Sequence, residues 1–115
     1  MEAGIVVFRR RGSELHGSWS HSNEAGKLAK GRAVGVKPGA LAGNWPVELF
    51  DADEKRFFSG YLESAGFGQC FKLTWRGRLH RPGAEGTMEG IGIALDGDTL
   101  CASFELVKPK AVPAA

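Results

Sequence analysis

The sequence lacks long apolar runs and contains few cysteines. No apolar stretch approaches the roughly 20 residues that a membrane-spanning helix needs. The first residues place an acid, Glu2, before the apolar run Ile5–Phe8 and three arginines, which is the reverse of the order in a secretory signal peptide. We therefore expect a cytoplasmic protein with no membrane partner. Cys70 and Cys101 are too few for a usual zinc site, and we expect both to be unpaired and packed as small hydrophobic side chains.

Strong charge and catalytic motifs are missing as well. Fifteen Lys and Arg residues against 13 Asp and Glu residues leave a formal net charge of +2, which is typical of a soluble domain rather than of a dedicated polyanion binder. The sequence has no nucleophile elbow, no phosphate-binding loop and no Cys–His pair of recognisable spacing. We therefore predict no catalytic residue, no cofactor and no metal. An enzymatic role, carried by Glu89 or His80 at a site of unrecognised type, ranks third among our functional hypotheses.

Three polar clusters have simpler interpretations than a metal site or an acid catalyst. His16 and His21 are separated by an odd number of positions, so a regular strand places their rings on opposite faces, and we expect both to be solvated. Residues 51–55 begin like a calcium loop but lack its central Gly and distal Glu, which predicts an ordinary acidic turn. Glu89 lies within an apolar strand pattern, and we expect it to face outward.

Basic residues are clustered at 9–11 and again at 76, 78 and 81, close to aromatic residues. Basic and aromatic side chains on one surface are typical of proteins that bind single-stranded nucleic acid. Here Phe71 and Trp75 alternate with Lys72 and Arg76, so rings and charges must face opposite sides of the strand. Nucleic acid is therefore not among the partners that we expect.

Glycine is what the sequence has in excess, with 17 residues of 115, while 43% of the residues are hydrophobic. Glycines interrupt most helix-length windows, whereas alternation of apolar and polar residues recurs along the chain. This combination predicts many short strands and tight turns rather than disorder. The length suits one domain, residues 1–115, of which we expect 108–115 to be a frayed tail.

The first hairpin is the clearest element. Gly12-Ser13 lies between two extended runs and suits a two-residue turn with Gly first. Counting outward from this turn places Phe8 opposite Gly17 and Val6 opposite Trp19. Gly17 then leaves room for the Phe8 ring. The apolar face of this hairpin consists of Val6, Phe8, Leu15 and Trp19.

Further strands are expected at 31–36, 47–51, 56–63 and 69–77, joined by loops at 37–46 and 78–86 and by turns at 51–55 and 64–68. The last hairpin, within 86–107, contains the strongest turn signal, Asp96-Gly97. A two-residue loop there pairs Ile93 with Leu100 and Ile91 with Ala102. A three-residue loop, from Asp96 to Asp98, exchanges the inward and outward residues of one strand, and the sequence leaves both registers open.

About eight strands in about 100 residues, joined mainly by hairpins, predict an all-β fold with little or no helix. The expected architecture is an antiparallel up-and-down β-barrel, because closure of the sheet removes exposed strand edges. The interior of a barrel with about eight strands is either filled by side chains or holds one small ligand.

In this sequence a strand ending in Trp, FSGYLESAGFGQCFKLTW, precedes the hairpin GTMEGIGIALDGDTLCASF, which has a G-I-G-I…D-G-D-x-L pattern. Over about two thirds of the chain, this arrangement resembles a family of small uncharacterised bacterial β-barrel proteins. Their segment similar to GIVVFRRRGSELHGSW follows that hairpin, so the order here resembles a circular permutation. Gly17-Ser18-Trp19 also matches the G-x-W of lipocalins and related calycin barrels. The resemblance implies a calycin-like or avidin-like barrel and no particular activity.

Bulky rings and glycines on the inward face lead to our first functional hypothesis, a non-enzymatic module that binds a small apolar or aromatic ligand at the barrel mouth. The residues expected at this site are Trp19, Trp75, Phe8, Phe71 and Tyr61. The alternative is a scaffold protein with a solid core that forms a homodimer through a flat outer face or an open sheet edge. Val7 and Ile5, which the first hairpin directs outward, motivate this alternative.

Overall fold

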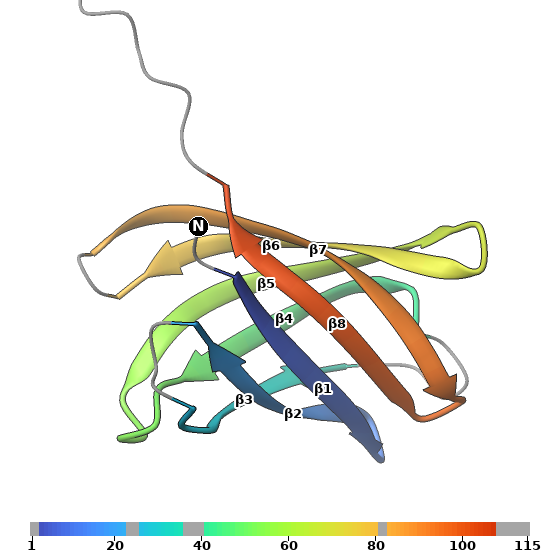
Figure 1. Ribbon diagram of the computed structural model, residues 1–115, viewed down its shortest axis with the longest axis horizontal. Helices are drawn as coiled ribbons and strands as arrows, with labels where there is room; N and C mark the ends of the chain where they lie inside the picture. Colours follow the sequence, from blue (N-terminus) through green and yellow to red (C-terminus); the bar gives the residue numbers. More distant parts are fainter. Residues whose placement is uncertain (1–2, 23–25, 36–40, 81–82, 108–115) are drawn as a thin grey trace, which may run out of the picture.

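Eight antiparallel strands form one closed barrel (Figure 1). The computed structural model describes residues 3–22, 26–35, 41–80 and 83–107. The strands are β1 (Ala3–Arg11), β2 (Glu14–His21), β3 (Ala29–Val34), β4 (Gly43–Phe50), β5 (Arg56–Phe67), β6 (Cys70–Leu79), β7 (Ala84–Asp96) and β8 (Thr99–Leu106). The predicted all-β, antiparallel barrel is confirmed. The frayed tail expected at 108–115 lies outside the described residues.

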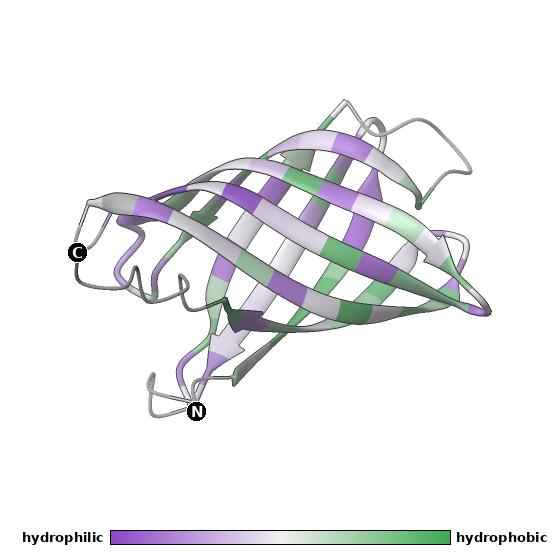
Figure 2. Cartoon of the chain, turned by 90° about the horizontal axis from the view of Figure 1, so that it is seen from above, coloured by the Kyte–Doolittle hydropathy of each residue, from purple (hydrophilic) through white to green (hydrophobic). Residues whose placement is uncertain are grey.

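Each strand pairs with its neighbours in chain order, and β1 closes the barrel by pairing with both β2 and β8. Figure 1 shows β1 and β8 side by side, so the two ends of the described chain lie on the same wall of the barrel. Along the strands hydrophobic and hydrophilic residues alternate (Figure 2), because successive side chains point into the barrel and out of it. No helix able to cross a membrane occurs among residues 3–22, 26–35, 41–80 and 83–107.

The predicted register of the first hairpin is confirmed. Phe8 pairs with Gly17 and Val6 with Trp19, and Gly12 adopts the positive φ, +62°, that the tight turn requires. A Cβ atom on Gly17 would lie 2.9 Å from Cε1 of Phe8. Gly17 therefore leaves the room that the Phe8 ring occupies.

Several predicted strand bounds are wrong. β3 begins at Ala29 rather than at 31 and ends at Val34; position 36 lies outside the described residues. β4 begins at Gly43, inside the expected loop 37–46, because Trp45 and Val47 both point into the core and Pro46 between them faces outward. The prolines and glycines of this segment led to the loop prediction, but Pro46 at an outward position does not interrupt the strand.

The two hairpins on either side of β6 are longer than predicted. β5 continues to Phe67, so the expected turn at 64–68 moves to Gly68-Gln69, where Gly68 has a φ of +59°. β6 continues to Leu79 and β7 begins at Ala84, so most of the expected loop 78–86 is strand.

The last hairpin has the pairing of the three-residue alternative rather than the Ile93–Leu100 pairing. Gly92 pairs with Ala102 and Ile93 with Cys101, while an irregularity between Ala94 and Asp96 leaves a two-residue turn at 97–98. The backbone N–H of Asp98 donates to Oδ1 of Asp96 at 2.8 Å, and this bond, together with the Thr99 side chain, lowers the pKa of Asp96. This register turns Ile91 and Ile93 outward.

The core consists of buried side chains from all eight strands. Trp19, Trp75, Phe8 and Phe58 are the largest fully buried residues. A Cβ atom on Gly92 would lie 2.7 Å from Cδ1 of Leu73, so this glycine leaves room for a core leucine. Cys70 and Cys101 are free, as predicted, but both are half-buried rather than fully packed in the core.

Candidate functional site

The structure places the five predicted ligand-site residues in three different environments. Trp19, Trp75 and Phe8 belong to one core cluster, and each is at most 2% exposed. Phe71 is half-buried and packs against that core. Tyr61 is 57% exposed. None of the five lines any of the four cavities that we describe among residues 3–22, 26–35, 41–80 and 83–107.

Phe104, which we did not predict as a site residue, connects the two tryptophans. Its ring meets Trp19 edge-on with the centroids 5.9 Å apart and meets Trp75 edge-on at 6.0 Å. Trp19 also packs on Phe57, at 5.2 Å. The alternation of Leu100, Ala102 and Phe104 on β8 carried a signal for this contact. Two tryptophans from opposite walls are thus bridged by an aromatic side chain rather than by open space.

The two buried indole N–H groups differ in their hydrogen bonding. Nε1 of Trp19 donates to the carbonyl oxygen of Lys30 at 2.9 Å. Nε1 of Trp75 is buried and has no partner among the described residues. A buried donor without an acceptor costs roughly 1–3 kcal/mol, so the Trp75 N–H is an unused donor inside the barrel.

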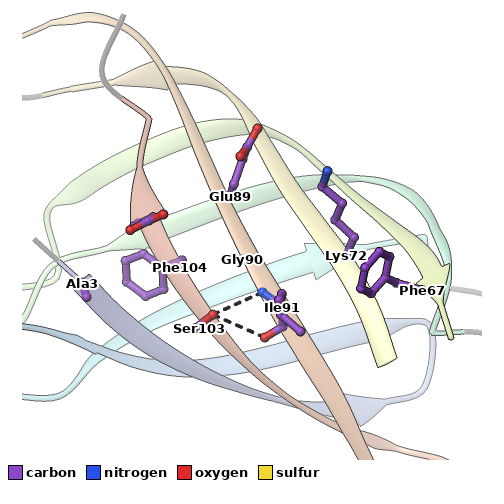
Figure 3. Close-up of a pocket in the computed structure, with 9 residues that line it drawn as sticks. Ala3, Phe67, Lys72, Glu89, Gly90, Ile91, Ser103 and Phe104 are labelled. Carbon is purple, nitrogen blue, oxygen red and sulfur yellow. Dashed lines mark hydrogen bonds between the residues drawn. The ribbon is translucent and has the colours of Figure 1, made fainter. Parts of the chain in front are cut away.

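A groove of about 450 Å³ lies on the outer surface over β7 and β8 (Figure 3). Its floor is formed where the β7 and β8 backbones come close: a Cβ on Gly90 would collide with the carbonyl group of Ser103. Here the hydroxyl of Ser103 takes part in the strand pairing. Its Oγ accepts the N–H of Ile91 at 3.2 Å and donates to the Ile91 carbonyl at 3.4 Å (dashed lines in Figure 3). Glycine and serine therefore leave this stretch of sheet open to solvent.

Large apolar side chains surround this groove. Ile91 and Phe67 line it, at 55% and 59% exposed. Ile93 follows Ile91 on the outer side of β7, and Ile5 on β1 pairs with Ser103 on the groove floor. We call the exposed surface formed by Ile5, Phe67, Ile91 and Ile93 the outer apolar face. Its rim carries charges of both signs: Lys72 lies on β6, Glu89 on β7 and Glu105 on β8.

The remaining candidate groups lie apart from one another. Glu89 is exposed, as expected, and lines the groove. Glu89 pairs with Thr74 on β6, whereas His80 lies six residues further along the chain, beyond the end of that strand. Nε2 of His80 is 2.8 Å from Oγ of Ser59. The structure therefore does not combine Glu89 and His80 in one site.

The acidic segment 51–55 folds as a turn held by one carboxylate. Oδ1 of Asp51 accepts the backbone N–H groups of Asp53 and Lys55, both at 2.9 Å. His16 is exposed, whereas His21 is half-buried and stacks on Phe104 with the centroids 6.2 Å apart. No group of three or more potential metal ligands occurs within the described ranges.

Comparison with protein-family models, with curated protein sequences and with solved structures finds no match. The barrel itself is consistent with the calycin-like fold that the G-x-W and D-G-D-x-L motifs suggest. Functional reasoning therefore rests on the groove, the outer apolar face and the core of this chain.

Proposed function

We propose that this protein is a non-enzymatic interaction module that forms a homodimer through its outer apolar face. The supporting observation is that Ile5, Phe67, Ile91 and Ile93 are each more than half exposed. Phe67 and Ile91 line the groove, Ile5 pairs with Ser103 of its lining, and Ile93 follows Ile91 on β7. Exposed apolar surface is typical of protein–protein interaction sites. Burying the exposed half of an isoleucine side chain gains about 1 kcal/mol, so several such residues on each copy provide a driving force.

Two further features favour a second copy of the chain as the partner. Every strand pairs on both sides, so the described barrel has no open sheet edge, and association has to use a face. The rim of the outer apolar face carries Lys72 as well as Glu89 and Glu105. In a two-fold interface the same surface of each copy meets itself, so a rim with charges of one sign would repel its own copy. The rim here carries charges of both signs.

Light scattering coupled to size-exclusion chromatography, at tens of micromolar chain, tests the homodimer. We expect the mass of a dimer for the unchanged protein and of a monomer for Ile93→Lys, because the lysine would place a charge inside the interface. The control is Leu28→Lys, which replaces a leucine that is 72% exposed but lies before β3, outside the outer apolar face. A monomeric unchanged protein, or dimers that survive Ile93→Lys, would contradict the proposal.

A second candidate function is binding of a small apolar or aromatic molecule inside the calycin-like barrel near Trp19 and Trp75. The unpartnered N–H of Trp75 supports it, because a ligand with one acceptor atom would satisfy this buried donor. The packed rings mean that such a ligand would have to displace Phe104 from between the tryptophans.

Tryptophan fluorescence in the presence of fatty acids, flavins and aromatic metabolites tests this second candidate. We expect a saturable change in emission for at least one compound, and we expect Trp75→Phe to abolish that change through loss of the hydrogen-bond donor. Trp45→Phe is the control, since Trp45 is also buried in the core but is not one of the two tryptophans that contact Phe104. Flat emission across all compounds would rule the candidate out.

A further inference from the structure

The outer surface of β1, β2 and β3 carries an unusual row of basic side chains. Arg9 on β1 pairs with His16 on β2, and His16 pairs in turn with Arg32 on β3. Side chains directly opposite each other in a sheet have Cβ atoms about 5 Å apart, so these three side chains lie close together. Carboxylates contact two of them: Oε1 of Glu14 lies 3.1 Å from Nε2 of His16, and Oε1 of Glu48 lies 4.0 Å from Nη2 of Arg32.

Two more basic residues flank this row. Arg11 follows Arg9 on the outer side of β1, and Lys30 precedes Arg32 on β3, where it pairs with Ser18. No carboxylate of the described residues forms an ion pair with Arg11 or Lys30. Four Lys and Arg side chains thus lie on β1 and β3, on either side of His16 on β2, in a protein whose net charge is only +2.

Arg9, Arg11 and Lys30 line a cavity of about 280 Å³, which is distinct from the groove over β7 and β8. Its polar lining consists of Arg9, Arg11, His16, Ser18 and Lys30. Carboxylates lie beside its lining: the Asp98 backbone N–H and, more weakly, Arg9 lower the pKa of Asp96, and Oε1 of Glu14 lies 3.1 Å from Nε2 of His16, a contact that orients the imidazole. No Phe, Tyr or Trp lines the cavity, so it has no ring on which a nucleic-acid base would stack.

We propose that this cavity binds a phosphate group of a small molecule. Guanidinium and ammonium groups form the strongest hydrogen bonds to phosphate oxygens, and the Ser18 hydroxyl adds a neutral donor. The cavity volume is just below the range of about 300–1,000 Å³ for small-molecule sites, which favours a compact polyphosphate over a larger ligand.

The test measures binding of tripolyphosphate to the full chain by isothermal titration calorimetry. The salt concentration is about 150 mM, where the Debye length is about 8 Å and distant charges are screened. We expect saturable binding that weakens about tenfold or more in Arg11→Gln/Lys30→Gln. This double variant keeps the Lys30 backbone carbonyl that Trp19 uses, so the core contact survives.

The control, Arg76→Gln/Lys55→Gln, also removes one Arg and one Lys, but from exposed positions on β6 and in the turn before β5. We expect it to change the affinity less than about twofold. Equal weakening in both double variants would overturn the proposal, because net charge alone would then drive binding. Lack of saturable binding would also overturn it, as would binding of a single-stranded oligonucleotide without binding of tripolyphosphate.

Discussion

Replacing Gly60 by alanine should lower the free energy of unfolding by about 3 kcal/mol. Gly60 on β5 pairs directly with Gly77 on β6. A Cβ on Gly60 would lie 2.7 Å from Cα of Gly77 and would collide with the carbonyl oxygen of Arg76. Both obstacles are backbone atoms, which no rotamer change can move. The two strands would have to separate, and their local hydrogen bonds would weaken.

Urea unfolding followed by circular dichroism measures this change. A loss of about 3 kcal/mol corresponds to a decrease in Tm of roughly 10–20 °C for a domain of this size. The control is Gly66→Ala on the same strand, where nothing lies within 4 Å of the added methyl group. We expect it to be neutral or to stabilise the protein by up to about 1 kcal/mol, since alanine loses less backbone entropy on folding. Similar losses in both variants would show that the close approach of β5 and β6 is not the cause.

The β1–β2 hairpin illustrates what the sequence predicts well. Its turn residues, Gly12-Ser13, lie between two extended runs, and the register counted from this turn places Val6, Phe8, Leu15 and Trp19 on one face. The steric reason for the glycine opposite Phe8 follows directly from this register. Where turn chemistry and alternation agree, register follows by counting.

The β7–β8 hairpin shows why the rest could not be predicted. Between Gly90 and Leu95 neither alternating set is polar, so either one can face the core. The irregularity near Leu95 reverses the orientation that the Asp-Gly signal suggests, because one additional residue in a strand exchanges its two faces. Gly92 rather than Ile91 or Ile93 is therefore buried, and the outer apolar face was visible in the sequence only through Ile5.

This reversal changes where a function can reside. The tryptophans that composition suggested as a ligand site are packed against Phe104, whereas the isoleucines that a two-residue loop would have paired with Leu100 and Ala102 are on the surface. The run of three arginines is also divided between the two faces of β1. Arg10 points to the opposite face from Arg9 and Arg11, and its Nε lies 3.1 Å from Oδ1 of Asp98. Arg9 and Arg11 line a cavity together with residues of β2 and β3. Cross-strand neighbours such as Lys30 cannot be found by scanning for runs of like charge.

The second large effect concerns Trp19, whose replacement by alanine should cost about 3–5 kcal/mol. The side chain is 2% exposed, packs on Phe57 and Phe104, and donates a hydrogen bond to Lys30. Total stabilities of small domains are about 5–15 kcal/mol, so Trp19→Ala should remove a large part of the stability of this barrel. Urea unfolding monitored by far-ultraviolet circular dichroism, which does not depend on tryptophan emission, measures the loss.

Phenylalanine substitutions separate the contribution of the ring from that of the N–H group. Trp19→Phe loses ring volume and also the bond to the Lys30 carbonyl, whereas Trp75→Phe loses ring volume and an N–H that has no acceptor among the described residues. We therefore expect Trp75→Phe to be the milder change by about 1 kcal/mol. If the two substitutions cost the same, the Trp75 N–H has an acceptor in solution. Such a result would favour a bound molecule in the core over an interior filled by side chains alone.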